Sequence, residues 1–340
     1  MASSGDSEGN AMGTTKSSVG RINWSDIGNK LGTALGLIIV FVLFAVLRPR
    51  EFPTFDNISL ILLQTAVVGT AALGMTLIIV SGGIDLSVGS SIALCTVVIA
   101  LLLSQKVPPL LAALGGVLAG AGCGLFISTL ITRLKLSPFI VTLGTWGAVR
   151  GLATGLAHET TVQAPTTWLN GLLTTLPPEK RWMLFPPGVW LVLVLGVLVS
   201  GMLRYTRFGR HVFAIGSNEQ TARLCGIPII PTKLLIYTIA GAFAGLAGVL
   251  QFSYLTVGDP TTASGYELDI IAAVVIGGAS LSGGQGSILG SLLGATIMTT
   301  IANGCTKMDL ANWVQQIVTG GIIIFAVALD HIRHRQNTRV

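Results

Sequence analysis

The chain has 340 residues, of which 51% are hydrophobic and only 10% are charged. Soluble domains carry about a quarter charged residues, so this composition indicates a protein whose surface faces lipid. The formal net charge of +6 does not indicate nucleic-acid binding, because the basic residues lie in short loops between apolar runs.

The chain begins with a polar tail rich in Ser and Gly, residues 1–30, in which no apolar core is followed by a small-residue cleavage site, so we do not expect a signal peptide there. A membrane-spanning helix needs about 20 mainly apolar residues. On that criterion we predict an all-α polytopic membrane protein with ten crossings, a transmembrane domain over 31–330 and a basic tail over 331–340. The predicted crossings are 31–47, 58–80, 86–104, 108–132, 137–155, 187–203, 232–256, 265–280, 286–303 and 313–330.

The eighth crossing, 265–280, differs from the others. It is short, begins with Glu267 and Asp269, and ends in Gly277-Gly278. We expect this helix to be broken or re-entrant, which is tolerated at membrane depth only where protein or water covers the backbone.

The basic residues predict the orientation. With both termini in the cytoplasm, thirteen of the twenty Lys and Arg residues fall inside, as the positive-inside rule favours. Arg48 and Arg50 oppose this arrangement. The orientation makes 156–186 a periplasmic loop and 204–231 the largest cytoplasmic loop, where a partner surface is expected.

Glycines at four-residue spacing predict close packing between helices, because they fall on one stripe and let backbones approach. The pattern comprises Gly116, Gly120 and Gly124 in the fourth crossing, Gly241 and Gly245 in the seventh, and Gly286, Gly290 and Gly294 in the ninth. Separately, segments 82–89 and 277–284 share the pattern GGxxLSxG. Transporters are often built from repeats, so this echo leaves both an internal duplication and a chance match open.

The cytoplasmic loop contains a candidate helix. Ser217 followed by Gln220 predicts a capping box, and the helix would end near Gly226, with Pro228 beyond. A short, charged helix between two crossings can act as a rigid contact for a cytoplasmic motor. The alternative is a surface helix without a partner.

Three acidic residues, Asp85, Glu267 and Asp269, fall within or beside membrane segments, where charge is costly and marks candidate function. We expect capping or gate-shaping roles ahead of direct substrate or proton binding. Ser264 with Glu267 fits a capping box, and Asp85 can cap the helix after it. The full set of pore or gate candidates is Gly82, Gly83, Asp85, Ser87, Glu267, Asp269, Gly277 and Gly278.

The sequence contains no catalytic signature. It has no GxxxxGK[ST] motif, so the chain is not itself an ATPase, and it has no HExxH, GxSxG or GxGD. The four cysteines stand apart without CxxC spacing and the histidines are scattered, so neither disulfides nor a metal site are expected.

Five stretches, 74–90, 138–145, 208–226, 265–278 and 280–290, are very similar to the ribose-type sugar permeases of ATP-binding-cassette (ABC) importers, the inner-membrane components of binding-protein-dependent transport systems. The resemblance extends over 52–330. It implies a permease subunit that moves a simple sugar (a ribose-like pentose, a hexose or a related compound) across the bacterial inner membrane.

The resemblance also implies partners: a second copy of the chain or a close paralogue, a cytoplasmic ABC ATPase that binds the ATP, and a periplasmic sugar-binding protein. The chain itself needs no cofactor. The resemblance places the family's ATPase-coupling helix at 217–226. The coupling residues are then Gly216, Ser217, Asn218, Glu219, Ala222, Arg223 and Gly226.

Two other classes of protein remain as alternatives. An ion-coupled secondary transporter could use Asp85, Glu267 or Asp269, and a membrane enzyme could use a buried acidic pair. The stretch 158–165 and the loop up to 186, with Trp168 and Trp182, depart from the ribose pattern and leave the sugar open.

Overall fold

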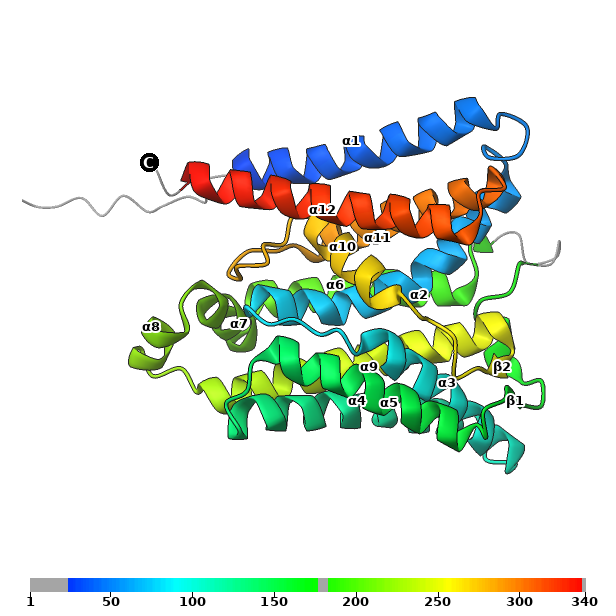
Figure 1. The fold of residues 1–340 in the computed structure, drawn as a ribbon, viewed down its shortest axis with the longest axis horizontal. Coiled ribbons are helices and arrows are strands. Elements are labelled where there is room, and N and C mark those ends of the chain that lie inside the picture. The colour runs from blue at the N-terminus through cyan, green and yellow to red at the C-terminus, as the bar shows by residue number, and fades with distance from the viewer. Residues whose placement is uncertain (1–23, 177–182, 338–340) are drawn as a thin grey trace, which may run out of the picture.

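The computed structural model describes residues 24–176 and 183–337, and helices carry almost all of the regular structure there (Figure 1). The helices are α1 (Trp24–Leu47), α2 (Phe55–Val80), α3 (Val88–Ser104), α4 (Pro109–Arg133), α5 (Pro138–Leu156), α6 (Pro187–Tyr205), α7 (Arg207–Ser217), α8 (Glu219–Leu224), α9 (Ile229–Leu255), α10 (Tyr266–Ile276), α11 (Ile288–Lys307) and α12 (Asn312–Asn337), with the 3₁₀-helix η1 (Trp168–Gly171). Two short strands, β1 (Val162–Gln163) and β2 (Val257–Gly258), pair antiparallel. This ribbon is an exception to the all-α prediction.

Six of the described helices, α2, α4, α5, α6, α9 and α11, are long and apolar enough to cross a membrane. Shorter apolar helices occupy Gly32–Leu47, Val88–Ser104 and Trp313–Phe325. The predicted eighth crossing is α10, which has only 11 residues and would rise about 16 Å. It is therefore short, as expected, and ten full crossings remain a prediction.

Helix α2 lies at the centre of the bundle. It packs against α9, α10, α11 and α6, and nearly all of its side chains from residue 61 onward are buried or half-buried. A helix that is hydrophobic on every side is expected in such a position. By contrast, α4 and α6 expose large side chains such as Leu118 and Val197.

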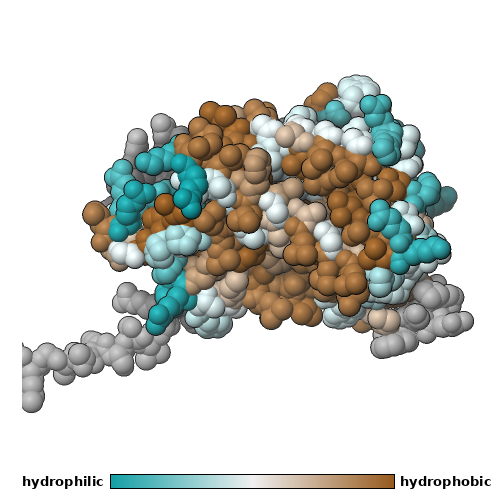
Figure 2. All heavy atoms as spheres, turned by 90° about the horizontal axis from the view of Figure 1, so that it is seen from below, coloured by the Kyte–Doolittle hydropathy of each residue, from teal (hydrophilic) through white to brown (hydrophobic). Residues whose placement is uncertain are grey.

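On the face shown in Figure 2, a broad apolar band lies between two hydrophilic ends. An apolar belt flanked by polar ends is the surface that a bilayer requires. The fold is that of a multi-pass membrane protein, with α7 and α8 at one end and the β1–β2 ribbon at the other (Figure 1).

Two helices extend beyond the predicted crossings. The apolar part of α1, Gly32–Leu47, matches the predicted crossing 31–47, but the helix begins at Trp24, and α12 continues to Asn337, past the predicted crossing 313–330. The apolar criterion detects only the part of a helix that lies in hydrocarbon, whereas polar turns can continue it into water. Residues 1–23, 177–182 (with Trp182) and 338–340 lie outside the described residues.

The predicted glycine contacts join two pairs of helices. A Cβ at Gly120 would strike the backbone of Gly241 and Gly245 on α9, and one at Gly124 would strike the Tyr237 carbonyl. Gly116 faces Ile99 instead. Helices α4 and α9 therefore pack backbone to backbone, as small-residue stripes allow.

The second pair is α10 and α11. Gly290 lies against the Gly277 carbonyl, and Gly294 lies against that of Ala273. Gly286 was wrongly placed in the helix, because α11 begins only at Ile288, where the Ser287 hydroxyl accepts a bond from the Gly290 N–H at 3.4 Å. Gly286 is nonetheless packed tightly, against Val80 and Ala279.

Candidate functional site

Helices α7 and α8 form a compact unit at one end of the molecule, within the predicted cytoplasmic loop 204–231 (Figure 1). Ile215 of α7, Ala222 of α8 and Ile229 of α9 bury a small apolar cluster that holds the unit together. Because that contact joins three helices, the loop is a folded element with a fixed position on the bundle.

The local sequence explains where α8 begins and ends. The Asn218 side chain accepts a bond from the Thr221 N–H at 2.9 Å, so Asn218 is the N-cap. The predicted Ser217–Gln220 capping box is wrong, since Ser217 is the last residue of α7. The predicted end is confirmed. Gly226, with φ of +79°, and the next residue bond back to Arg223 and Ala222 in a Schellman motif.

Helix α7 was not predicted, although its start has a recognisable signal. The Thr206 hydroxyl accepts a bond from the Gly209 N–H at 3.1 Å, and the buried face consists of Gly209, Val212 and Ile215. Thr206 is thus a normal N-cap, and the spacing 209, 212, 215 is a helical one.

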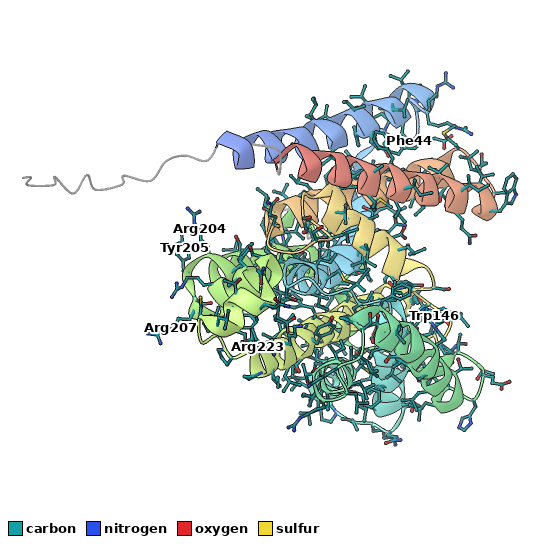
Figure 3. All side chains as sticks on the ribbon, turned by 60° about the vertical axis from the view of Figure 1, so that its left-hand side comes forward. Phe44, Trp146, Arg204, Tyr205, Arg207 and Arg223 are labelled. Atoms are coloured by element: carbon teal, nitrogen blue, oxygen red, sulfur yellow. The ribbon has the colours of Figure 1, made fainter. Side chains whose placement is uncertain are left out.

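The exposed side of α8 offers contacts to a partner. Leu224 is 88% exposed and the Arg223 side chain is 68% exposed, at the same end of the molecule as Arg204 and Arg207 (Figure 3). Glu219, in contrast, is engaged internally. It bonds Lys233 of α9 at 2.7 Å and Arg223 at 3.3 Å, so it ties α8 to the membrane domain.

The end of α7 touches two irregular segments of the membrane domain. One is 81–87, between α2 and α3, and the other is 277–287, between α10 and α11. A Cβ at Gly216 would strike both the Val80 carbonyl and the Gly284 nitrogen, which are themselves bonded at 2.8 Å. Gly283 packs against Gly82 and Gly216. We call this meeting of Val80, Gly82, Gly216, Gly283 and Gly284 the glycine junction.

The two segments that share the pattern GGxxLSxG, 82–89 and 277–284, meet at this junction but are not equivalent in structure. Gly82 and Gly278 are the left-handed residues that end α2 and α10, with φ of +79° and +91°. In the shared pattern GGxxLSxG, however, Gly82 aligns with Gly277. In addition, α3 begins directly after Ser87, whereas α11 begins six residues after Ser282. The offset weakens the case for duplication.

Asp85 organises the first of these segments. It is buried, and its Oδ1 accepts bonds from the Ser87 N–H at 2.8 Å and the Ser87 hydroxyl at 2.6 Å. This turn leads directly into α3. Gly83 lies beside the Tyr237 hydroxyl, which donates a 3.4 Å bond to the Ile84 carbonyl. The contacts give Asp85 a shaping role, and Ser87 is the N-cap position without a side-chain cap bond.

Glu267 and Asp269 occupy the first turn of α10, where negative charge is favourable. The predicted Ser264–Glu267 capping box is wrong. The N-cap is Gly265, with φ of +88° and no side-chain cap bond. Only a residue without Cβ adopts that conformation easily, so the chain enters α10 through backbone geometry.

Glu267 reaches the start of α3. Its Oε2 lies against the backbone of Gly89, and it is buried without a hydrogen-bond partner among the described residues. The N-termini of the two short helices α3 and α10 therefore converge inside the bundle. Discontinuous helices whose ends meet at membrane depth are a feature of transporter pathways.

Arg150, in the middle of α5, was missed as a candidate. Its Nη1 donates bonds to the carbonyls of Pro260 and Thr262, both at 2.7 Å. Arg150 thus clamps the chain between β2 and α10. A basic residue inside an apolar run was the available signal.

No group of three His, Cys, Asp or Glu side chains within the described ranges is arranged to hold a metal ion. Of the four cysteines, Cys95 and Cys305 are buried, Cys123 is half-buried and Cys225 beside Leu224 is exposed. The candidate site consists of the α7–α8 unit, the glycine junction and the region where α3, Arg150 of α5 and the start of α10 come together.

Comparison with known proteins decides the family. The family model for the branched-chain amino acid transport system permease component matches residues 57–327. The ribose import permease protein RbsC of Bacillus subtilis is 39% identical over 314 residues, covering 91% of this chain and 95% of the relative. The chain belongs to the ribose-type sugar ABC permease family.

Other members carry different sugars in their names. The L-arabinose permease AraH of Azospirillum brasilense is 34% identical, covering 88% of each chain. The D-allose permease AlsC of Escherichia coli is also 34% identical, covering 91% of this chain and 94% of the relative. No solved structure matches. Members of the family are permease subunits, and the ATPase is a separate subunit.

Proposed function

We propose that this chain is the membrane-spanning subunit of an ATP-driven importer that carries a simple sugar across the bacterial inner membrane. Both termini and the α7–α8 unit face the cytoplasm in this proposal, and loop 156–186 faces the periplasm. Two copies, or one copy and a close paralogue, enclose the pathway. A separate ABC ATPase binds the ATP and contacts α8, and a periplasmic protein delivers the sugar.

The observation that carries the proposal is the position of the α7–α8 unit. Its outer side presents exposed Leu224 and Arg223, and its inner end rests on two irregular membrane segments at once. To transfer force, the α7–α8 unit needs exposed side chains that a partner can bind and a close backbone contact with the membrane segments. A surface helix without a partner would need neither.

The contacts suggest how movement would pass through the chain. A push on α8 reaches α9 through the Glu219–Lys233 pair and reaches the glycine junction through Gly216. Beyond the junction, the segments 81–87 and 277–287 lead into α3 and α11. Because irregular backbone shifts at lower cost than a continuous helix, these segments are the natural places for a gate.

The relatives support a sugar as substrate. Their names include ribose, arabinose and allose, at 34 to 39% identity to this chain. A pentose or hexose is therefore the class to test first. The departures in 158–165 and the rest of the outer loop leave the individual sugar to the binding protein that delivers it.

The test is transport by the purified chain in proteoliposomes. With the ATPase, the binding protein and ATP present, uptake of labelled ribose, arabinose or allose is expected, and an ATPase unable to hydrolyse ATP serves as the control. Uptake driven by a proton or sodium gradient without the ATPase would contradict the proposal. That result would favour an ion-coupled transporter using Glu267 or Asp269.

A further inference from the structure

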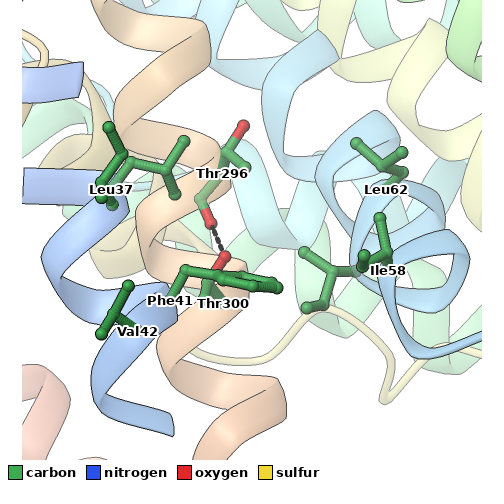
Figure 4. Close-up of a pocket in the computed structure, with 9 residues that line it drawn as sticks. Leu37, Phe41, Val42, Ile58, Leu62, Thr296 and Thr300 are labelled. Atoms are coloured by element: carbon green, nitrogen blue, oxygen red, sulfur yellow. Dashed lines mark hydrogen bonds between the residues drawn. The ribbon is translucent and has the colours of Figure 1, made fainter. Parts of the chain in front are cut away.

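A cavity of about 290 Å³ lies on the outside of the bundle between α1, α2 and α11 (Figure 4). Helix α1 contributes Leu37, Phe41 and Val42, and α2 contributes Ile58 and Leu62. Val42 is 51% exposed on the rim, so the cavity opens onto the apolar band and hence toward the bilayer.

Two threonines complete the wall but add no polarity to it. The Thr300 hydroxyl donates to the Thr296 carbonyl at 2.6 Å (Figure 4), and the Thr296 hydroxyl donates to the Leu292 carbonyl at 2.9 Å. Both hydroxyls are therefore engaged within α11. An apolar cavity of even about 150 Å³ stays dry and binds apolar molecules, and a sugar would lose its hydrogen bonds there. The occupant must be hydrocarbon.

Positive charges lie beyond the cavity, at the end of the bundle opposite α8. Arg48 is paired with Asp309 at 3.3 Å. In contrast, Arg50 and Lys307 have no carboxylate within 4.0 Å among the described residues. Helix α1 ends at Leu47, five residues or roughly 8 Å beyond Val42, and Arg50 lies in the turn that follows. That spacing suits a lipid whose chain enters the cavity and whose phosphate stays at the polar boundary.

We propose that an anionic phospholipid binds here, with one acyl chain in the cavity and its phosphate near Arg50 and Lys307. The site accounts for basic residues at the end of α1 that the positive-inside rule does not explain. The lipid fills the seam between α1 and the core, so it holds that helix against α2 and α11. The proposal does not depend on which solute the chain carries.

Native mass spectrometry of the full chain in detergent, titrated with phosphatidylglycerol, tests the acyl site. Val42→Trp should fill the cavity and remove one tightly retained lipid per chain. Val46→Trp is the matched control, because Val46 is 72% exposed on the same helix and does not line the cavity. Equal lipid retention by both variants would overturn the proposal, as would a second copy of the chain bound in place of the lipid.

The headgroup is tested by comparing phosphatidylglycerol with phosphatidylethanolamine of the same chains. Arg50→Gln and Lys307→Gln should each weaken phosphatidylglycerol binding about fivefold, and leave phosphatidylethanolamine binding unchanged. Lys106→Gln, on the turn between α3 and α4, is the control and should change neither. Unchanged phosphatidylglycerol affinity in both variants would overturn the assignment of the headgroup.

Discussion

Asp85 is buried and Arg150 is half-buried, and each bonds to the backbone of an irregular segment of the chain. Asp85 accepts a bond from the Ser87 N–H, and Arg150 donates to the carbonyls of Pro260 and Thr262, in the segment before α10. A buried backbone group without a partner costs about 1–3 kcal/mol. Each of these side chains therefore decides whether its segment holds one conformation.

Replacing Arg150 should destabilise the region before α10. Arg150→Met leaves the carbonyls of Pro260 and Thr262 without their donor, so we expect a loss of about 2 kcal/mol or more in stability and loss of transport. Arg150→Lys should fall between Met and wild type. Thermal unfolding of the purified chain measures the effect, with Arg133→Met at the exposed end of α4 as control. Equal melting temperatures for the two Met variants would show that the clamp is dispensable.

Leu224 should dominate the contact with the ATPase. Leu224→Asp is expected to weaken ATPase binding by at least about 30-fold, the effect of losing an interface residue worth about 2 kcal/mol. Because Leu224 is 88% exposed in the isolated chain, its melting temperature should not change. Gln220→Ala on the same helix is the control. Undiminished affinity of Leu224→Asp for the ATPase would remove Leu224 from the interface.

Single residues show why the sequence predicted only part of the site. Asn218 and Ser217 are both good N-cap residues, and only the end of α7 decides between them. Arg150 was missed because the prediction treated only carboxylates as candidate charges within the membrane segments. Leu224 was missed because an apolar residue in a short charged helix normally belongs to its buried face. All three depend on tertiary contacts that a local pattern does not contain.

Among the helices, the predicted bounds agree best with the structure where the apolar run is long. The helices α2, α4, α5, α6 and α9 lie within a few residues of prediction, because nothing but a helix satisfies a long backbone in lipid. Helix α7 was not predicted, because its 11 residues are too few to meet the length criterion for a membrane crossing. The short α10 was expected from its flanking acids and glycines, while the two-residue strands had no signal of their own.

The glycine stripe on α4 can be tested within one helix. Gly120→Val should separate α4 from α9 and cost about 1–3 kcal/mol or more, as overpacking does, so less folded protein should be recovered. Gly122→Val is the matched control, because a Cβ at Gly122 meets nothing within 4 Å. Size-exclusion yield and melting temperature report the difference. Normal recovery of the Gly120 variant would contradict the packing role.

The glycine junction predicts a separation of docking from transport. A Cβ in Gly216→Ala would lie 2.6 Å from the Gly284 nitrogen and strike the Val80 carbonyl, so the end of α7 must move away from both segments. We expect ATPase binding to persist while ATP-driven uptake falls at least tenfold. Ser217→Ala, at the exposed neighbouring position, should transport normally. If Gly216→Ala also transports normally, the junction does not carry the movement.

At the scale of the whole molecule, the positions of the short helices give information that membership of the family alone does not. Helices α3 and α10 begin inside the bundle and meet through Gly89 and Glu267, while α8 lies at one end and the basic residues Arg50 and Lys307 at the other. The two ends thus differ in chemistry: one carries the proposed docking helix and the other the proposed lipid site. Orientation in the membrane determines which function each end can serve.

The native cysteines make that orientation measurable. Cys225 is the exposed one of the four and lies beside Leu224 at the end of α8. A membrane-impermeant maleimide should therefore label Cys225 in inside-out vesicles and not in intact cells, and bound ATPase should protect it. Cys225→Ser should abolish the label, and His158→Cys in the same background should restore it from the outside. Labelling of Cys225 from outside would reverse the topology and remove α8 from reach of any cytoplasmic ATPase.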